Sequence, residues 1–226
     1  MKQLDLEVTS LREVNSTLQN EKSNNFKNWE ILNPKGAHAV AVGLQKKINV
    51  SINGSTGYYC GGMNKEATIT INGSTGPGVA ENMMSGSIIV KGDASQYAGA
   101  TARGGTLIIE GNASSRCGIS MKGVDIIVKG SIGHMSCFMG QSGNLVVLGD
   151  AGASLGDSIY EAKIFVRGKV KSLGADCIEK KLNKNDLLIL KNLLIKSNID
   201  IDPHEFKRYG SARKLYNFNI NNVSDY

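Results

Sequence analysis

The side chains best suited to nucleophilic, redox or metal chemistry in this sequence are its four cysteines, Cys60, Cys117, Cys137 and Cys177. A thiol redox pair or a thiolate metal site requires several cysteines at close spacing, as in Cys-x-x-Cys. No such pair occurs in the chain. The spacing predicts four separate, buried thiols in a reducing compartment.

The histidines and glycines, like the cysteines, do not form a recognisable catalytic or ligand-binding motif. His38, His134 and His204 are scattered, and no Ser-His-Asp arrangement is legible around them. Gly-x-Gly fragments are frequent, but a phosphate-binding loop must open a helix, and each fragment here leads into another β-forming run. We therefore expect no catalytic residue, no cofactor-binding residue and no metal ligand in this chain.

The composition excludes several other classes of protein. The net charge of +6 is moderate, and no dense basic stripe with interleaved aromatic residues suggests nucleic acid. No apolar run reaches the ~18 residues that a membrane span needs, and the first residues do not resemble a signal peptide. These features predict a cytoplasmic protein. The 27 glycines beside 3 prolines indicate many sharp turns in an ordered fold.

An internal repeat predicts the strands and turns that would position any functional site. A short aliphatic run ending in X-Gly recurs seven times, and consecutive glycines are 19 residues apart. These glycines are Gly54, Gly73, Gly92, Gly111, Gly130, Gly149 and Gly168. A repeat this short, without helical periodicity, predicts a parallel β-helix. The expected fold is all-β, a right-handed parallel β-helix of seven coils with short helical flanks.

Stacked coils place equivalent residues about 4.8 Å apart. Residues four and two before each glycine are aliphatic throughout, so they are predicted to face the interior. The residues just before the glycine include the alternation Lys91, Glu110, Lys129, which predicts a charge ladder on the outer face. Cys117 and Cys137 lie one coil apart but one position out of register, so their side chains should face opposite ways.

One outward column is unexpectedly apolar. Three residues before the glycine the sequence reads Ser51, Thr70, Ile89, Ile108, Ile127, Val146 and Phe165. Exposed apolar stripes of this kind are usually covered. A helix predicted over 184–196, about 20 Å long, matches the stripe. Either that helix or a partner subunit covers it, so Ile108 and Ile127 are candidate interface residues.

The flanks divide the chain into three parts. Residues 1–47 form an N-terminal flank with a capped helix over 10–20 and a lead-in strand at 39–43. The β-helix occupies 48–177. Residues 178–226 hold the helix over 184–196 and, from His204 on, an extended arm that wraps a neighbour or is disordered.

Two coils depart from the smooth repeat. The first carries Tyr58, Tyr59 and Asn64, and the second carries Glu81 and Asn82. One interpretation is a polar ladder that satisfies turn carbonyls. The other is contact with a partner subunit, which makes these five residues candidates for an interface.

These irregular segments carry a family resemblance. The segments are 57–65, 78–86, 116–123, 133–139 and 156–162. They resemble the glutamate synthase C-terminal β-helix family, also called the GXGXG family, over about residues 28–180. A free-standing chain of this size is most similar to the β-helix subunits of methylamine–glutamate N-methyltransferases (N-methylglutamate synthases) and of their glutamate-synthase-like paralogues.

The resemblance implies a three-part enzyme complex in which this chain is structural. It implies a class II glutamine-amidotransferase-like partner and an FMN- and iron–sulfur-containing synthase-like partner. The implied reaction converts methylamine and glutamate to N-methylglutamate and ammonia. The family supplies no catalytic residue to assign here, and no cofactor is expected in this chain.

Two other functions remain open from the sequence. A related β-helix occurs in formylmethanofuran dehydrogenase, as a separate chain beside a molybdenum or tungsten protein. A stand-alone ligand-binding β-helix would be expected to show an aromatic groove, and the aromatic share of 6% argues against it.

Overall fold

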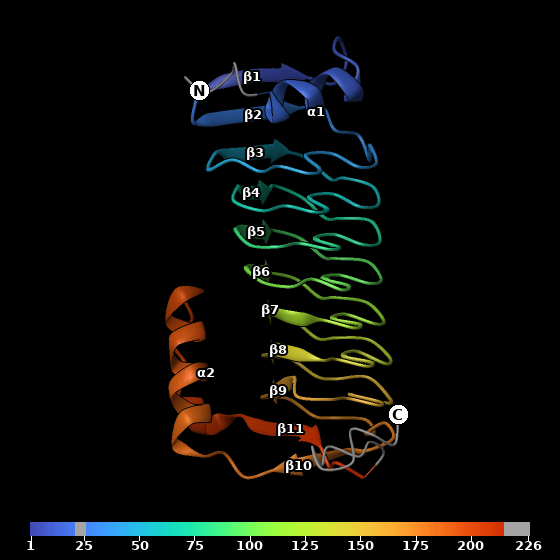
Figure 1. Cartoon of the computed structure of the whole chain (residues 1–226), viewed down its shortest axis with the longest axis vertical. Coiled ribbons are helices and arrows are strands. Elements are labelled where there is room, and N and C mark those ends of the chain that lie inside the picture. The colour runs from blue at the N-terminus through green and yellow to red at the C-terminus, as the bar shows by residue number, and fades with distance from the viewer. Residues whose placement is uncertain (21–25, 215–226) are drawn as a thin grey trace, which may run out of the picture.

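The computed structural model describes residues 1–20 and 26–214 and has the shape of a column of stacked coils (Figure 1). One strand per coil contributes to an 11-stranded sheet of order β1-β2-β3-β4-β5-β6-β7-β8-β9-β11-β10. The strands are β1 (Lys2–Asp5), β2 (Asn28–Leu32), β3 (Asn49–Asn53), β4 (Thr68–Ile71), β5 (Ser87–Val90), β6 (Thr106–Ile109), β7 (Lys122–Val128), β8 (Ser142–Val147), β9 (Lys163–Val166), β10 (Cys177–Lys180) and β11 (Lys207–Ser211). The predicted all-β parallel β-helix is confirmed.

The 19-residue register holds through all seven predicted coils, β3 to β9. Val50 pairs with Ile69, Ile69 with Ile88, and the same step continues to Ile164. The two aliphatic columns of the strand are buried, as predicted. On the outside, Glu110 lies 3.0 Å from Lys91 and 3.4 Å from Lys129, which confirms the charge ladder.

Another strand precedes the predicted coils. β2 pairs in parallel with β3, and Trp29 and Ile31 of β2 are buried. The lead-in strand predicted at 39–43 is wrong. That segment is a turn with left-handed residues at Ala39, Ala41 and Gly43, and its backbone hydrogen-bonds to the turn of the next coil.

The turn that follows each strand has an alternating backbone. In the first coil Tyr59, Gly61 and Met63 all have positive φ, at 61°, 64° and 55°. The N–H groups of Tyr59 and Met63 donate to the following coil, and that of Gly61 donates to Val40 in the preceding one. Neighbouring coils are therefore joined by hydrogen bonds at the turns as well as in the sheet.

The glycines of the repeat serve two different needs. Gly73, at the end of a strand, does not have positive φ, but a Cβ there would lie 2.6 Å from the backbone nitrogen of Ser55. Close approach between coils therefore requires glycine at this position. Seven residues after the repeat glycine a second glycine recurs with positive φ, at Gly61, Gly99, Gly118 and Gly156. Ala80 and Cys137 adopt the same conformation where this glycine is replaced.

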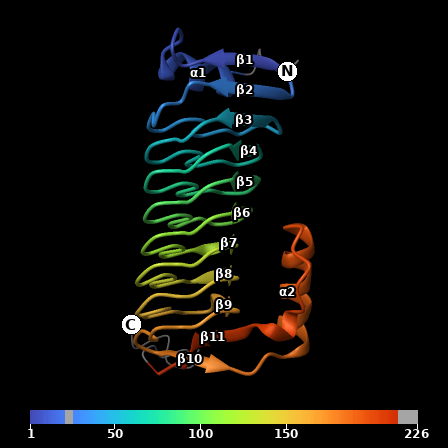
Figure 2. The same cartoon turned by 180° about the vertical axis from the view of Figure 1, so that it is seen from behind.

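Helix α2 (Lys184–Lys196) covers the apolar stripe. It begins at the N-cap Asn183 and runs beside β7 to β9 in both views (Figures 1 and 2). A second apolar cluster forms between helix and sheet from Ile108, Ile127, Val146, Phe165, Leu190, Leu193, Leu194 and Phe206. Of the two alternatives that the sequence left open, the chain's own helix is the one that covers the stripe. Leu190 and Leu194 of the helix are buried, whereas Leu188 and Ile195 are exposed.

Both ends of the described column are capped. At the start, α1 (Leu11–Gln19) has the predicted capping box from Ser10 to Glu13 and buries Val14 and Leu18. Its Asn15 donates to the carbonyl of Ala39 and accepts from the N–H of Ala41. These bonds satisfy backbone groups of the turn at 39–43, which has no complete coil on its other side.

At the other end, β11 inserts antiparallel between β9 and β10. The prediction of an extended arm from His204 that wraps a neighbour or is disordered is therefore wrong as far as Lys214, because Phe206 and Tyr209 are buried in the chain's own fold. The rest of that segment, 215–226, lies outside the described residues.

Candidate partner interface

The two tyrosines proposed for an interface lie in the turn after β3. Tyr58 is 52% exposed, and its ring lies 4.3 Å from the ring of His38. The backbone N–H of Tyr58 donates to Nδ1 of His38. Tyr59 is half-buried. The result is an accessible aromatic pair, His38 and Tyr58, at a fixed corner of the column.

Asn64 has a structural role instead. It is fully buried, its amide donates to the carbonyls of Ala67 and Ser85, and its oxygen accepts from the N–H of Ala67. The interpretation as a polar group that satisfies turn backbone holds for this residue. Asn64 is therefore not available to a partner in this fold.

Glu81 and Asn82 are half-buried in the next turn. Burial raises the pKa of the Glu81 carboxyl above its usual value. The side-chain oxygen of Asn82 accepts from the Thr101 hydroxyl at 2.6 Å, which links two coils. Ile108 and Ile127 lie elsewhere, beneath α2, so the predicted candidates do not form one patch.

A shallow groove that the sequence did not reveal lies beside Asn82. Its volume is about 460 Å³. It is lined by Gln45, Met63, Lys65, Asn82, Met84 and Arg103. The lining comes from the turns of consecutive coils. The sequence did contain one sign of this groove, because methionine and basic residues occur at matching positions of successive repeats.

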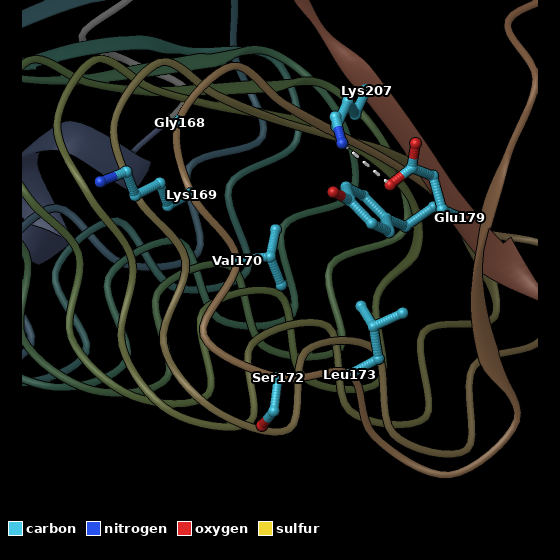
Figure 3. A pocket seen from close by; sticks show the side chains of 8 residues that line it. Gly168, Lys169, Val170, Ser172, Leu173, Glu179 and Lys207 are labelled. Carbon is cyan, nitrogen blue, oxygen red and sulfur yellow. Dashed lines mark hydrogen bonds and ion pairs between the residues drawn. The ribbon is translucent and has the colours of Figure 1, made fainter.

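A larger open depression lies at the far end of the column (Figure 3), with a volume of about 530 Å³. Two of its charged members, Lys207 and Glu179, form an ion pair at 3.3 Å, and both are more than half exposed. Burial raises the pKa of the neighbouring Tyr209. A solvated ion pair beside a protonated phenol offers neither an activated nucleophile nor a poised base.

The four cysteines are buried and free of disulfides. Burial raises the pKa of Cys60, Cys117 and Cys177 to about 12, and it raises that of Cys137 as well. The prediction that Cys117 and Cys137 face opposite ways is wrong, since both are fully buried. Cys137 has left-handed backbone, with φ of 58°, which breaks the strict alternation of a strand.

Metal-binding and membrane-spanning features are not found in the described part of the chain. Within 1–20 and 26–214, no three His, Cys, Asp or Glu side chains are grouped so that they could hold a metal ion. No helix in these two ranges is long and apolar enough to cross a membrane.

Comparison with known proteins gives two matches. The family described as GXGXG motif matches residues 31–199. Protein GlxC of Rhizobium meliloti (strain 1021) is 64% identical over 225 residues, and the alignment covers 99% of each chain. The family match begins in β2, includes all seven coils and ends just after α2. The covering helix therefore lies inside the matched unit.

Proposed function

Since the match covers most of its length, this chain belongs to the GXGXG motif family, and we propose that it is a non-catalytic structural subunit of a glutamate-synthase-like enzyme complex. The observation that carries the proposal is the match of the whole β-helix, from β2 to α2, to that family. A rigid column with a repeated hydrogen-bond network is suited to holding other subunits at fixed positions.

The potentially reactive side chains are engaged in packing and ion pairs, which supports a structural role. The four thiols are buried within the fold, and their raised pKa values keep them protonated at neutral pH. Asp186 is buried against Lys163 and Arg208, where it joins α2 to the sheet. Groups that would carry chemistry elsewhere are engaged here in packing and in ion pairs.

In finer detail, we propose that the complex forms N-methylglutamate from methylamine and glutamate. The partners would be a class II glutamine-amidotransferase-like subunit and an FMN-dependent synthase-like subunit. An iron–sulfur cluster needs accessible thiolates, and the thiols of this chain are buried and protonated. We therefore assign the iron–sulfur cluster to the synthase-like partner, where the family resemblance also puts FMN.

Reconstitution tests this proposal. Amidotransferase-like and synthase-like proteins of the same organism are purified and mixed with and without this chain, and N-methylglutamate is measured by mass spectrometry. We expect product with all three chains and at least tenfold less when this chain is omitted. A product rate that does not depend on this chain would refute the structural role. Consumption of a different amine would refute only the assigned reaction.

A further inference from the structure

A column with three basic residues runs along four consecutive coils. Lys65, Met84, Arg103 and Lys122 occupy the eleventh position after the glycine of each coil. Their backbone N–H groups donate to the preceding coil at 2.8, 2.7, 2.7 and 2.7 Å, so the four residues are stacked in register. The strand spacing sets them about 4.8 Å apart.

The centre of this column is apolar. Met84 is 45% exposed and Met63, on the neighbouring position, is 47% exposed. Both line the groove of about 460 Å³, with Lys65 on one side and Arg103 on the other. Exposed methionines are flexible and polarizable, and they are frequent at protein-binding surfaces.

The basic side chains of the column lack counter-charges. Within 1–20 and 26–214, Lys65, Arg103 and Lys122 form no ion pair, whereas Lys91 and Lys129 on the sheet side share Glu110. The neighbouring acids are Glu66, which is exposed, and Glu81, whose carboxylate lies against Gly78. Neither acid pairs with the column. Stacked like charges repel one another, and an acidic surface would relieve that repulsion.

We propose that this basic methionine groove, lined by Met63, Lys65, Met84 and Arg103 and continued by Lys122 along the same column, docks a partner subunit through an acidic surface with an apolar centre. This inference rests on the proposed function. An apolar centre with a charged rim is the usual build of a protein–protein interface. A polyanion such as nucleic acid would use the basic residues and would gain nothing from two exposed methionines.

Charge reversal tests the rim. The double variant Lys65→Glu/Arg103→Glu is titrated against the purified amidotransferase-like and synthase-like proteins. We expect the Kd for one of them to weaken roughly 10- to 100-fold. The matched control is Lys169→Glu/Lys171→Glu, which reverses two exposed lysines away from the groove. Its Kd should stay within about twofold of wild type.

A second variant, Met84→Lys, tests the apolar centre and keeps the groove basic. For a protein partner it should weaken binding about tenfold, because a charge replaces the central contact. Tighter binding of a single-stranded DNA probe to Met84→Lys than to wild type, with partner binding unchanged, would instead identify a polyanion site. That result would overturn the inference.

The two proposals fail in different ways. If wild-type protein binds a partner and the Lys65→Glu/Arg103→Glu variant binds it equally well, the groove is not the docking surface, but the structural role stands. If wild-type protein binds neither candidate subunit, both the proposed function and this inference are overturned. Circular dichroism of each variant checks that the β-helix remains folded.

Discussion

At the scale of single residues, the turns hold most of the backbone strain. Left-handed conformations cost a residue with a Cβ roughly 1–2 kcal/mol relative to glycine. Yet Tyr59 and Met63 adopt them in one coil and Ala80 adopts one in the next. The hydrogen bonds between coils hold these conformations in place, because each of these turn N–H groups has an acceptor in a neighbouring coil.

Gly61 and Ala80 occupy equivalent positions in neighbouring coils, but we expect substitutions at the two positions to change the stability differently. A Cβ at Gly61 would lie 2.6 Å from Cδ1 of Ile88, so Gly61→Ala should destabilise the protein by about 2 kcal/mol. Ala80→Gly is the matched control and should be neutral or mildly stabilising. Urea unfolding measures both. Equal stability of Gly61→Ala and wild type would contradict the described packing.

The buried thiols predict a loss of stability in alkali. Folding raises the pKa of Cys60 and Cys117 from 9.0 to about 12. Below pH 9 both the folded and the unfolded chain keep these protons. Above pH 9 the unfolded chain releases them first, so the free energy of unfolding falls as pH rises toward 12. Urea midpoints at pH 8 and pH 10 measure the decline, which should be shallower in Cys60→Ala/Cys117→Ala.

The sequence was least informative at this scale. It predicted buried thiols, and it identified Tyr58 as an exposed departure from the repeat. It left open whether Asn64 satisfies the turn or contacts a partner, and it wrongly placed Cys117 and Cys137 on opposite faces, since both points depend on left-handed turn residues. Strand periodicity assumes that successive side chains alternate, and that assumption fails where φ is positive.

At the scale of elements, α2 is attached to the column at both ends. Near its start Asp186 contacts Lys163 at 2.8 Å and Arg208 at 3.3 Å, and at its end Lys196 contacts the Thr106 hydroxyl. Between these points Leu190 and Leu194 are buried on the stripe. The helix is therefore an integral layer of the fold.

The ion pairs of Asp186 allow a prediction of how strongly the start of α2 is attached to the column. Removal of its carboxylate leaves Lys163 and Arg208 without their partner in a mostly buried site. Asp186→Ala should lower the free energy of unfolding by about 3 kcal/mol. Asp186→Asn keeps an acceptor for the helix cap and should cost less. Thermal unfolding compares the two, and a cost as large for asparagine as for alanine would show that the charge itself is what matters.

The covered stripe predicts that Ile127→Lys disrupts folding. The residue is fully buried under α2, so a lysine there should cost more than about 3 kcal/mol. Leu188→Lys, on the exposed face of the same helix, should change stability by less than about 0.5 kcal/mol. Calorimetry measures both. A folded Ile127→Lys protein with wild-type stability would mean that α2 does not cover this site.

At the scale of the whole molecule, the repeat is the feature that the sequence predicted best. The 19-residue spacing of Gly54, Gly73 and the later glycines is enough to specify the seven coils and their register. The ends were harder, because α1, β2 and β11 complete the column through contacts that no repeat encodes. The groove around Met84 was missed because it joins side chains from four coils.

The coil is a unit that can be removed. Deletion of the 19 residues 74–92 should leave a shorter, cooperatively folded β-helix, because each coil contacts mainly its neighbours. Deletion of the 18 residues 74–91 shifts every later side chain by one position and should abolish folding, since the apolar columns would then face outward. Circular dichroism and urea unfolding distinguish the two. Similar behaviour of both deletions would contradict the register.

The central claim is that this column is a structural subunit of a glutamate-synthase-like complex. Native mass spectrometry of the chain co-expressed with the amidotransferase-like and FMN-dependent synthase-like proteins tests it most directly. We predict a single assembly that contains all three chains, with FMN retained by the synthase-like chain. A chain that remains a free monomer while both other proteins are present and folded would contradict the account.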